Sequence, residues 1–383
     1  MDRQREFQIF VKPAGAKCNL DCSYCYYLEK DELYPGTKKW VMADALLEEY
    51  IIQHIGATTS QTVFFSWHGG EPTLAGLDFF RKAVSIQKKH LPSGATLLNG
   101  IQTNGTLIND EWCRFFAEEN FMVGISIDGP PEMHNLYRVD KQGKGLYSQV
   151  LNGYQLLQRY NVTTEILCVL NAMNVNYPLE VYRFFKGLGA RFLTFLPLVE
   201  RQHDSPTGVT PESVPAEAFG RFLVRVFDEW VEHDIGSIKI QVFEEALRTA
   251  FNQEHTLCIF KENCGGVPVV EHNGDFYSCD HYTDKEHLLG NIRDHNLAYF
   301  LDSPRQRDFG RKKSSTLPEY CIQCPVKNMC NGECPKNRFI KTPAGESGLN
   351  YLCSGYRMFF THCKPFVETV RAAWKNQGKT TLL

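Results

Sequence analysis

Strand-like and helix-like segments alternate through the first half of this 383-residue chain. Six short apolar stretches are typical of strands: Phe7–Lys12, Thr62–Trp67, Thr96–Gln102, Phe121–Ile127, Thr163–Leu170 and Phe192–Leu198. Amphipathic segments lie between them, at Ala43–Ile55, Leu77–His90, Asp110–Glu119, Tyr147–Tyr160 and Tyr177–Leu188. A helix with a strong apolar stripe is predicted after the last strand, at Ala216–His233. Strands joined by crossover helices pair in parallel. The pattern therefore predicts an α/β fold: a partial, TIM-like (β/α)6 barrel that stops short of eight units.

Unusual polar motifs follow the first four predicted strands, where a barrel of this kind carries its chemistry. They are Cys18-x3-Cys22-x2-Cys25, His68-Gly-Gly-Glu-Pro72, Gln102-Thr-Asn-Gly105 and Ser126-Ile-Asp-Gly-Pro130. Glycine beside polar residues is common where a backbone approaches a ligand closely, although each motif alone could be a plain turn. Gathered on one rim, the four motifs predict a pocket.

The three cysteines of the first motif, Cys18, Cys22 and Cys25, indicate a reactive metal site. A structural zinc or a closed iron-sulfur site takes four protein ligands, whereas three thiolates leave one metal position free for a substrate or cofactor. The spacing alone also fits part of a zinc site, or cysteines that merely share a loop.

Composition limits the class of protein. The content of 43% apolar and 22% charged residues is that of an ordinary soluble enzyme, and the net charge of −3 gives no broad basic field for nucleic acid or anionic lipid. Met1–Glu6 is too charged for a secretory signal, and no run reaches the roughly 18 apolar residues of a membrane helix. We therefore expect a cytoplasmic protein whose fourteen cysteines are reduced rather than joined as disulfides.

Eight further cysteines mark a second domain. They are Cys258, Cys264, Cys279, Cys321, Cys324, Cys330, Cys334 and Cys353. Eight thiolates are enough for two fully ligated 4Fe-4S clusters, but also for two four-cysteine zinc sites. The change of composition predicts a barrel over residues 1–234, and a linker, a cysteine-rich domain and a C-terminal helix over residues 235–383.

The motif CxxxCxYC after an N-terminal strand resembles the signature of the radical S-adenosylmethionine (SAM) enzymes. The resemblance implies that Cys18, Cys22 and Cys25 hold a 4Fe-4S cluster whose fourth iron is chelated by SAM, and that SAM is cleaved to a 5′-deoxyadenosyl radical. It also implies a set of SAM contacts, namely Tyr24, Gly69, Gly70, Ser126, Arg138 and Leu198. Arginine binds a carboxylate through two parallel hydrogen bonds, although Arg138 could equally form a surface ion pair.

The spacing of the later cysteines looks like the SPASM pattern, an extension of radical SAM enzymes that modify peptides and proteins. The resemblance assigns one set of ligands to a first auxiliary 4Fe-4S cluster: Cys258, Cys264, Cys279 and Cys334. It assigns the remaining set to a second: Cys321, Cys324, Cys330 and Cys353. Three clusters and SAM are therefore the expected cofactors.

Over the stretch from Val11 to about Cys363 the chain resembles the anaerobic sulfatase-maturating enzymes. That resemblance implies oxidation of a Cys or Ser in a sulfatase to Cα-formylglycine, in a short Cys/Ser-x-Pro-x-Arg segment, with Asp280 accepting the side-chain proton. A hydrogen-bonded turn is the plain alternative for Asp280. Tyr27 is a candidate contact for the substrate peptide, or packs on the barrel rim. An electron donor such as flavodoxin or ferredoxin is expected as a second partner.

Two other functions are compatible with parts of the sequence. One is a different SPASM enzyme that cross-links or epimerises a small peptide; such enzymes often carry a leader-binding domain, and only six residues precede the first predicted strand here. The other is a non-catalytic electron carrier or a zinc-stabilised binding protein. The glycine-rich rim beside the three cysteines argues against the second, since a carrier needs no pocket.

Overall fold

The computed structural model of the chain describes residues 5, 7–36 and 39–376. The described chain folds into two compact units. The first comprises the described residues up to Ile127, with His134–Glu165 and Gly265–Gly310; the second comprises Asp128–Met133, Ile166–Cys264 and the described residues from Arg311 on. The predicted domain boundary between residues 234 and 235 was drawn from the change in composition along the sequence, and it stays a prediction. Residues 1–4 and 6, which enter the expectation of no export signal, lie outside the described residues.

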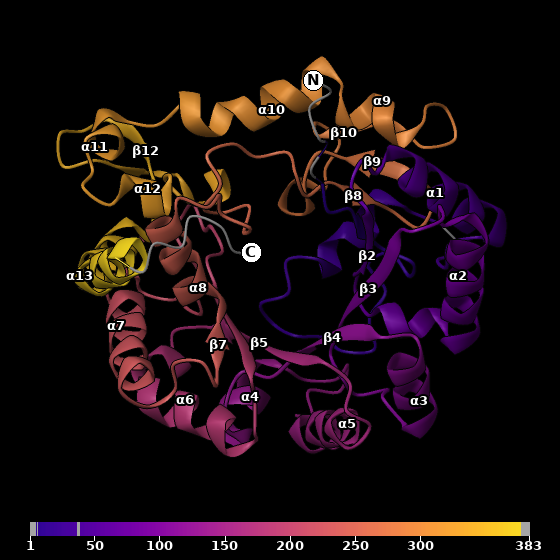
Figure 1. The fold of residues 1–383 in the computed structure, drawn as a ribbon, viewed down its shortest axis with the longest axis horizontal. Coiled ribbons are helices and arrows are strands. Elements are labelled where there is room, and N and C mark those ends of the chain that lie inside the picture. The colour runs from indigo at the N-terminus through magenta and orange to yellow at the C-terminus, as the bar shows by residue number, and fades with distance from the viewer. Residues whose placement is uncertain (1–4, 6, 37–38, 377–383) are drawn as a thin grey trace. The chain divides into compact units, whose positions relative to one another are not determined.

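The first unit contains four parallel strands in sequence order: β1 (Phe10–Val11), β2 (Thr62–Trp67), β3 (Thr96–Thr103) and β4 (Phe121–Ser126). The helices α1 (Asp44–Ala57), α2 (Leu77–His90) and α3 (Asp110–Glu118) line one face of these strands (Figure 1). Helix α5 spans Tyr147–Arg159. Trp67 at the end of β2 is fully buried and meets Phe80 of α2 edge to face. These elements confirm the predicted alternation.

Strand β1 is shorter than the predicted strand, but the extended backbone continues around it. Gln8 N donates to Gly266 O at 2.8 Å, and Lys12 N donates to Val270 O at 2.9 Å. The partner is β8 (Val269–Val270), which pairs with β1 in parallel. An antiparallel arrangement follows, with β9 (Asp275–Tyr277) and β10 (Leu288–Asn291). The first unit therefore extends its sheet with strands from the cysteine-rich part of the sequence.

The second unit contains β5 (Thr164–Leu170) from Ile166 on, and the strands β6 (Phe192–Pro197) and β7 (Lys239–Ile240), all three parallel. Its longest helices are α7 (Ala216–His233) and α13 (Cys353–Asn376), which lie side by side (Figure 1). Phe219 on α7 meets Tyr356 on α13 at 5.0 Å between ring centroids. The predicted helix at 216–233 is confirmed with its apolar stripe buried.

The remaining elements are short. The α-helices are α4 (Pro131–Tyr137), α6 (Pro178–Gly187), α8 (Gln241–Arg248), α9 (Leu297–Leu301), α10 (Pro304–Ser315), α11 (Glu319–Ile322) and α12 (Lys327–Cys330). The 3-10 helices are Leu28–Leu33, Pro72–Ala75, Asn174–Asn176, Thr249–Phe251, Asp280–Tyr282 and Pro335–Asn337, and a small hairpin joins β11 (Ile340–Lys341) to β12 (Ser347–Leu349). Among the described helices none is long and apolar enough to span a bilayer.

Candidate active site

The loop that carries Cys18, Cys22 and Cys25 follows β1 and is tied down on both sides of its cysteines. Leu20 forms an isolated bridge with Asp140, and Ser23 N donates to Tyr137 O at 3.1 Å. Burial, together with the charges of Glu71, Cys22 and Cys25, raises the pKa of the Cys18 thiol to about 12, although a hydrogen bond from Leu20 N opposes the rise. The influence of the Cys22 and Cys25 charges on Cys18 indicates that the three sulfurs lie near one another.

Asparagine side chains connect this loop to the end of β3. Asn104 Nδ2 donates to Asn19 Oδ1 at 2.9 Å, and Asn19 Nδ2 donates to Thr106 Oγ1 at 2.8 Å. Asn104 Nδ2 also lies 3.7 Å from Cys18 Sγ. The Thr-Asn-Gly motif is therefore not a plain turn, because it holds the cysteine loop from the neighbouring strand.

The Gly-Gly-Glu-Pro motif after β2 packs directly on the backbone that leads to Cys18. Gly70 N donates to Gly15 O at 2.9 Å, and a Cβ at Gly70 would lie 2.3 Å from Lys17 O. Any side chain at position 70 would push the cysteine loop away. Glycine is thus required at position 70 because two backbone segments touch there. This requirement is separate from the prediction that SAM approaches Gly69 and Gly70.

Glu71 of the same motif joins the ends of β2 and β3. Its fully buried carboxylate accepts from Thr73 N at 3.0 Å, from Thr103 Oγ1 at 2.8 Å and from Asn104 N at 2.7 Å. Burial raises the pKa of Glu71, although these hydrogen bonds oppose the rise. The carboxylate therefore fixes the rim from within the protein.

Two of the predicted SAM contacts are buried on this rim with partners that fix their orientation. Ser126, at the end of β4, has its Oγ 3.2 Å from Gln102 Nε2. The guanidinium of Arg138, which is 7% exposed, lies 5.5 Å from the ring centroid of Tyr24. An exposed surface ion pair, the alternative for Arg138, does not fit this burial.

Asp280 lies at the start of a 3-10 helix, directly after Cys279, and its side chain meets the cysteine loop and β1. Lys12 Nζ is 2.6 Å from Asp280 Oδ1, and the Tyr26 hydroxyl donates to Asp280 Oδ2. Burial alone would raise the pKa of this carboxyl, but Lys12, His281 and the Tyr26 hydroxyl outweigh it and lower the pKa to about 2. Asp280 is therefore held ionised, in contact with Tyr26, the residue that follows Cys25.

Two predicted site residues lie away from solvent. Tyr27 is 2% exposed, donates to Glu271 and carries Lys12 Nζ over its ring at 4.0 Å. Leu198 is 7% exposed in the second unit, where its backbone N donates to Leu170 O at 2.8 Å. Their contacts with peptide and SAM stay predictions.

Sequence reasoning missed Lys12, Tyr26 and Glu71. Lys12 ends an apolar strand, a position where a lysine is buried only if a carboxylate meets it. That signal was available, but its partner Asp280 is 268 positions further along the sequence, and no spacing predicts such a contact.

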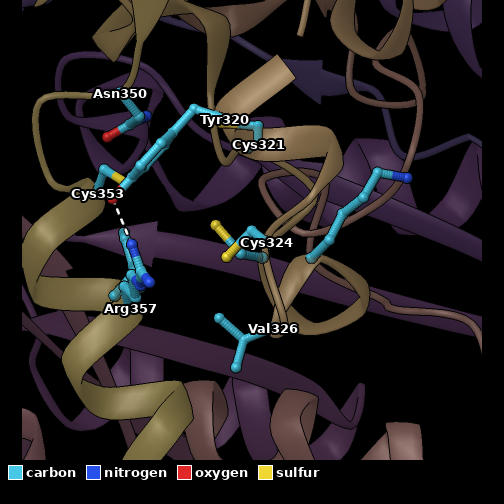
Figure 2. Close-up of a pocket in the computed structure, with 11 residues that line it drawn as sticks. Tyr320, Cys321, Cys324, Val326, Asn350, Cys353 and Arg357 are labelled. Carbon is cyan, nitrogen blue, oxygen red and sulfur yellow. Dashed lines mark hydrogen bonds between the residues drawn. The ribbon is translucent and has the colours of Figure 1, made fainter. Parts of the chain in front are cut away.

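In the second unit, Cys321, Cys324, Cys330 and Cys353 line one hollow, whose space free of atoms is about 430 Å³. Figure 2 shows Cys324 and Cys353 on its two sides, with Arg357 of α13 hydrogen-bonded to the Tyr320 hydroxyl. Burial raises the pKa of Cys330 to about 12 and that of Cys353 to about 11. These four residues are the predicted ligands of the second auxiliary cluster.

A buried lysine, Lys313, and a half-buried arginine, Arg338, lie among the cysteines of this unit. Lys313 is 0% exposed and donates to Cys258 O at 2.8 Å and to Ile259 O at 2.7 Å. Both cations counteract the rise in pKa that burial imposes on the Cys264 thiol. Buried cations need negative charge nearby, and two sources of it act on both Lys313 and Arg338: the buried carboxylate of Glu333 and the sulfur of Cys264. Thiolate-ligated clusters would add to this negative charge.

The three residues after Cys330 hold an unusual conformation. Asn331, Gly332 and Glu333 all have positive φ, between 47° and 71°. Arg338 donates to the three carbonyl oxygens of these residues, at 2.9 to 3.1 Å. Arg338 therefore stabilises a strained turn in the chain between Cys330 and Cys334.

Known protein families match both the barrel sequence and the cysteine-rich sequence. Residues 13–185 match the model of the radical SAM superfamily, and residues 258–325 match SPASM, an iron-sulfur cluster-binding domain. The serine-type anaerobic sulfatase-maturating enzyme of Bacteroides thetaiotaomicron is 44% identical, over 96% of this chain and 92% of that protein. The cysteine-type enzyme of Clostridium perfringens is 33% identical, over 93% of this chain and 96% of that one. The chain belongs to the anaerobic sulfatase-maturating enzyme family.

A solved structure of a maturase supports the same conclusion. Native anSMEcpe with bound AdoMet and Kp18Cys peptide is 32% identical and superposes with a TM-score of 0.86, over 96% of this chain and 99% of that one. The predicted fold class is confirmed: a radical SAM α/β fold followed by a SPASM domain. This maturase is a radical SAM oxidoreductase that uses SAM and iron-sulfur clusters, so neither the carrier nor the zinc-stabilised protein describes it.

The residues present fit these cofactors. Among the described residues no three His, Cys, Asp or Glu side chains converge closely enough to hold a single metal ion. The donor set consists of thiols with the cations Lys313 and Arg338 beside them, which fits iron-sulfur clusters, whose cysteine ligands each bind a different iron. Cys279 belongs to the first unit and Cys258, Cys264 and Cys334 to the second, so the ligand set of the first auxiliary cluster stays a prediction.

Proposed function

We propose that this maturase oxidises a serine or cysteine in a Cys/Ser-x-Pro-x-Arg segment of a sulfatase to Cα-formylglycine, with Asp280 as the proton acceptor. The observation that carries the assignment of Asp280 is its contact with Tyr26, the residue after Cys25. A carboxylate in this position is within reach of whatever reacts beside the cysteine loop. The substrate is an extended segment, which suits an unfolded or nascent sulfatase.

The chain's own side chains have distinct tasks in this proposal. Cys18, Cys22 and Cys25 hold one cluster, and Arg138, positioned by Tyr24, binds the carboxylate of SAM with Ser126, Gly69 and Gly70 beside it. When bound, this cluster and SAM supply a 5′-deoxyadenosyl radical, which removes a hydrogen atom from Cβ of the substrate residue. Leu198 adds an apolar contact and Tyr27 a contact to the peptide.

Asp280 accepts the proton of the substrate hydroxyl or thiol at its carboxylate. Lys12 and Tyr26 keep that carboxylate ionised and orient it through contacts to both oxygens. The eight cysteines of the SPASM region would hold two auxiliary clusters, which would supply an acceptor for an electron. Lys313, a buried cation, and Arg338, a partly buried one, favour extra negative charge there.

We further propose that serine is the preferred target and that the reaction is cytoplasmic, with flavodoxin or ferredoxin as the electron carrier. Relatives 44% and 37% identical are serine-type, and the cysteine-type relative is 33% identical. A reducing compartment keeps the three cysteines of the loop and the eight of the SPASM region available for clusters.

The experiment is a turnover reaction without oxygen. Reconstituted enzyme, SAM and dithionite are incubated with two peptides that differ only in Ser or Cys at the target position. We expect 5′-deoxyadenosine and an aldehyde on the target residue by mass spectrometry, formed faster from the serine peptide. Deoxyadenosine without any aldehyde on either peptide would refute the proposed substrate.

A further inference from the structure

Lys313 on α10 is buried against the backbone at the start of the cysteine-rich sequence. Its side chain is 0% exposed, and Nζ donates to Cys258 O at 2.8 Å and to Ile259 O at 2.7 Å. A lysine is seldom buried completely, because burial removes its charge from water. The two carbonyl oxygens stabilise the ammonium group but carry no full negative charge. The ion therefore needs negative charge in the protein around it.

Thiols of one predicted ligand set supply part of this negative charge. Burial lowers the pKa of Lys313, and the charges of nearby groups oppose the fall, among them the sulfurs of Cys258, Cys264 and Cys334. These are the three predicted ligands of the first auxiliary cluster that belong to the second unit. The predicted ligands of the second cluster line the hollow described above, which Lys313 does not line. Lys313 is thus grouped with the first ligand set.

Arg338 provides a contrast, because its charge acts on both ligand sets. Burial lowers the pKa of Arg338, whereas the charges of nearby groups raise it, among them the sulfurs of Cys264 and Cys321. Cys264 belongs to the first predicted set and Cys321 to the second. One buried carboxylate, that of Glu333, acts on both Arg338 and Lys313. A single carboxylate that faces two cations leaves a surplus of positive charge beside the cysteines.

We propose that Lys313 raises the reduction potential of the first auxiliary cluster selectively and so makes that cluster the better electron acceptor of the two. The inference rests on the proposed function, in which an auxiliary cluster is the acceptor. Reduction of a cluster adds one electron, and it makes and breaks no bond. Net charge and burial set the potential of such a cluster. A buried cation beside it favours the reduced form, which carries one more negative charge.

A redox titration of the reconstituted full-length enzyme tests this role. The clusters are reduced stepwise with dithionite and followed by electron paramagnetic resonance, in the wild-type background and with Cys22→Ala, which leaves only the auxiliary signals. The variants are Lys313→Gln and Lys313→Met, both neutral. Glutamine can still donate to a carbonyl oxygen, whereas methionine cannot. The matched control is Lys312→Met, which removes the same charge from an exposed neighbour on α10.

We expect one of the two auxiliary midpoint potentials to fall in both neutral variants. At a fixed potential the ratio of reduced to oxidised cluster falls at least ~10-fold, which corresponds to ~59 mV for one electron. The other auxiliary midpoint moves less, because its predicted ligands line a hollow that Lys313 does not line. Lys312→Met leaves both midpoints unchanged, since water and salt screen an exposed charge. Iron content is measured on each variant and is expected to match wild type.

Unchanged or raised midpoints in both neutral variants would overturn the inference, as would an equal shift of the two auxiliary clusters or the same shift in the Lys312→Met control. A shift in Lys313→Met alone would overturn it too, because the hydrogen bonds of Lys313 and not its charge would then be responsible. Loss of iron from Lys313→Gln would show a structural role and would also contradict it. Failure of the proposed function is seen separately, as wild-type enzyme whose auxiliary clusters titrate but that forms no aldehyde on either peptide.

Discussion

The rim of the first unit and the cysteine-rich part of the second unit both present cysteines, but they are held by different means. On the rim, Asn19, Glu71 and Asn104 attach the cysteine loop to strands of six and eight residues. In the second unit, Cys321 and Cys330 lie on helices of four residues each, and nearby strands have two or three. Such elements bury little apolar surface of their own.

This difference indicates which of the two sites has its shape before its cofactor binds. The three-cysteine loop gains its shape from hydrogen bonds among protein groups, so it is preorganised for the cluster proposed there. The four-cysteine hollow has a strained turn, the buried Lys313 and the half-buried Arg338, and we expect its shape to depend also on ligation of the proposed cluster. The rim is the more rigid reactive site, and the hollow the more metal-dependent one.

The largest expected effect is that of Cys22→Ala, which separates the two regions. We expect SAM cleavage to fall by more than about 100-fold, since even residues behind a metal ligand are worth 10–100-fold. The auxiliary clusters should persist, because their ligands are other cysteines. Deoxyadenosine release and iron content after anaerobic reconstitution measure both. SAM cleavage that survives the substitution would refute the ligand assignment, and loss of all iron would refute the independence of the two regions.

Asp280→Ala should reduce aldehyde formation more than it reduces SAM cleavage. We expect aldehyde formation to fall ~10²–10⁴-fold, the usual contribution of a positioned base, while SAM cleavage continues. Removing the carboxylate leaves Lys12 buried without its partner, which destabilises the protein. Asp280→Asn removes the same charge but keeps the size of the side chain and an oxygen that can accept from Lys12, so it controls for the loss of packing. Peptide mass spectrometry gives the aldehyde yield at matched iron content. Undiminished aldehyde in both variants would remove Asp280 as the proton acceptor.

The alternation of strands and helices was predictable because regular elements show in local periodicity. The helices at 77–90 and 216–233 match the structure to the residue, and the rim motifs follow their strands as expected. The ion pair of Lys12 with Asp280, and the clamp of Arg338 on residues 331–333, were not predictable. Each of these two interactions joins a side chain to a partner that is placed by tertiary contacts. The spacing of residues along the sequence does not predict such contacts.

Removal of iron is expected to have a smaller effect on folding, confined to one region. After chelation and oxidation of the clusters, limited proteolysis should cut first between residues 317 and 353, where the elements are shortest. The parallel strands β2 to β4 should stay protected, because their order rests on apolar burial and on hydrogen bonds such as those of Glu71. Mass spectrometry of the fragments, compared with the iron-loaded enzyme, gives the sites. Equal protection of both regions after iron loss would contradict the contrast drawn between them.

The smallest expected effect tests whether hydrogen bonds also support the metal-dependent region. Buried Glu245 on α8 accepts from Thr256 N and Leu257 N, both at 3.0 Å, and pairs with His255 Nδ1 at 2.7 Å, directly before Cys258. Burial raises the pKa of Glu245, but these hydrogen bonds outweigh it, and the net pKa is lowered from its ordinary 4.5. The ionised form therefore adds stability above that pH and loses it as the pH falls further.

We expect Glu245→Gln to lower the free energy of unfolding of the cluster-loaded enzyme by ~1–3 kcal/mol at pH 7, and the difference from wild type to shrink below pH 4.5. Thermal denaturation at pH 7 and at pH 4 measures both. Glu244→Gln, which makes the same charge change on the same helix but without these contacts, is the control. A loss as large as that caused by iron removal would mean that the hydrogen bonds before Cys258, and not the clusters, hold this part of the chain together.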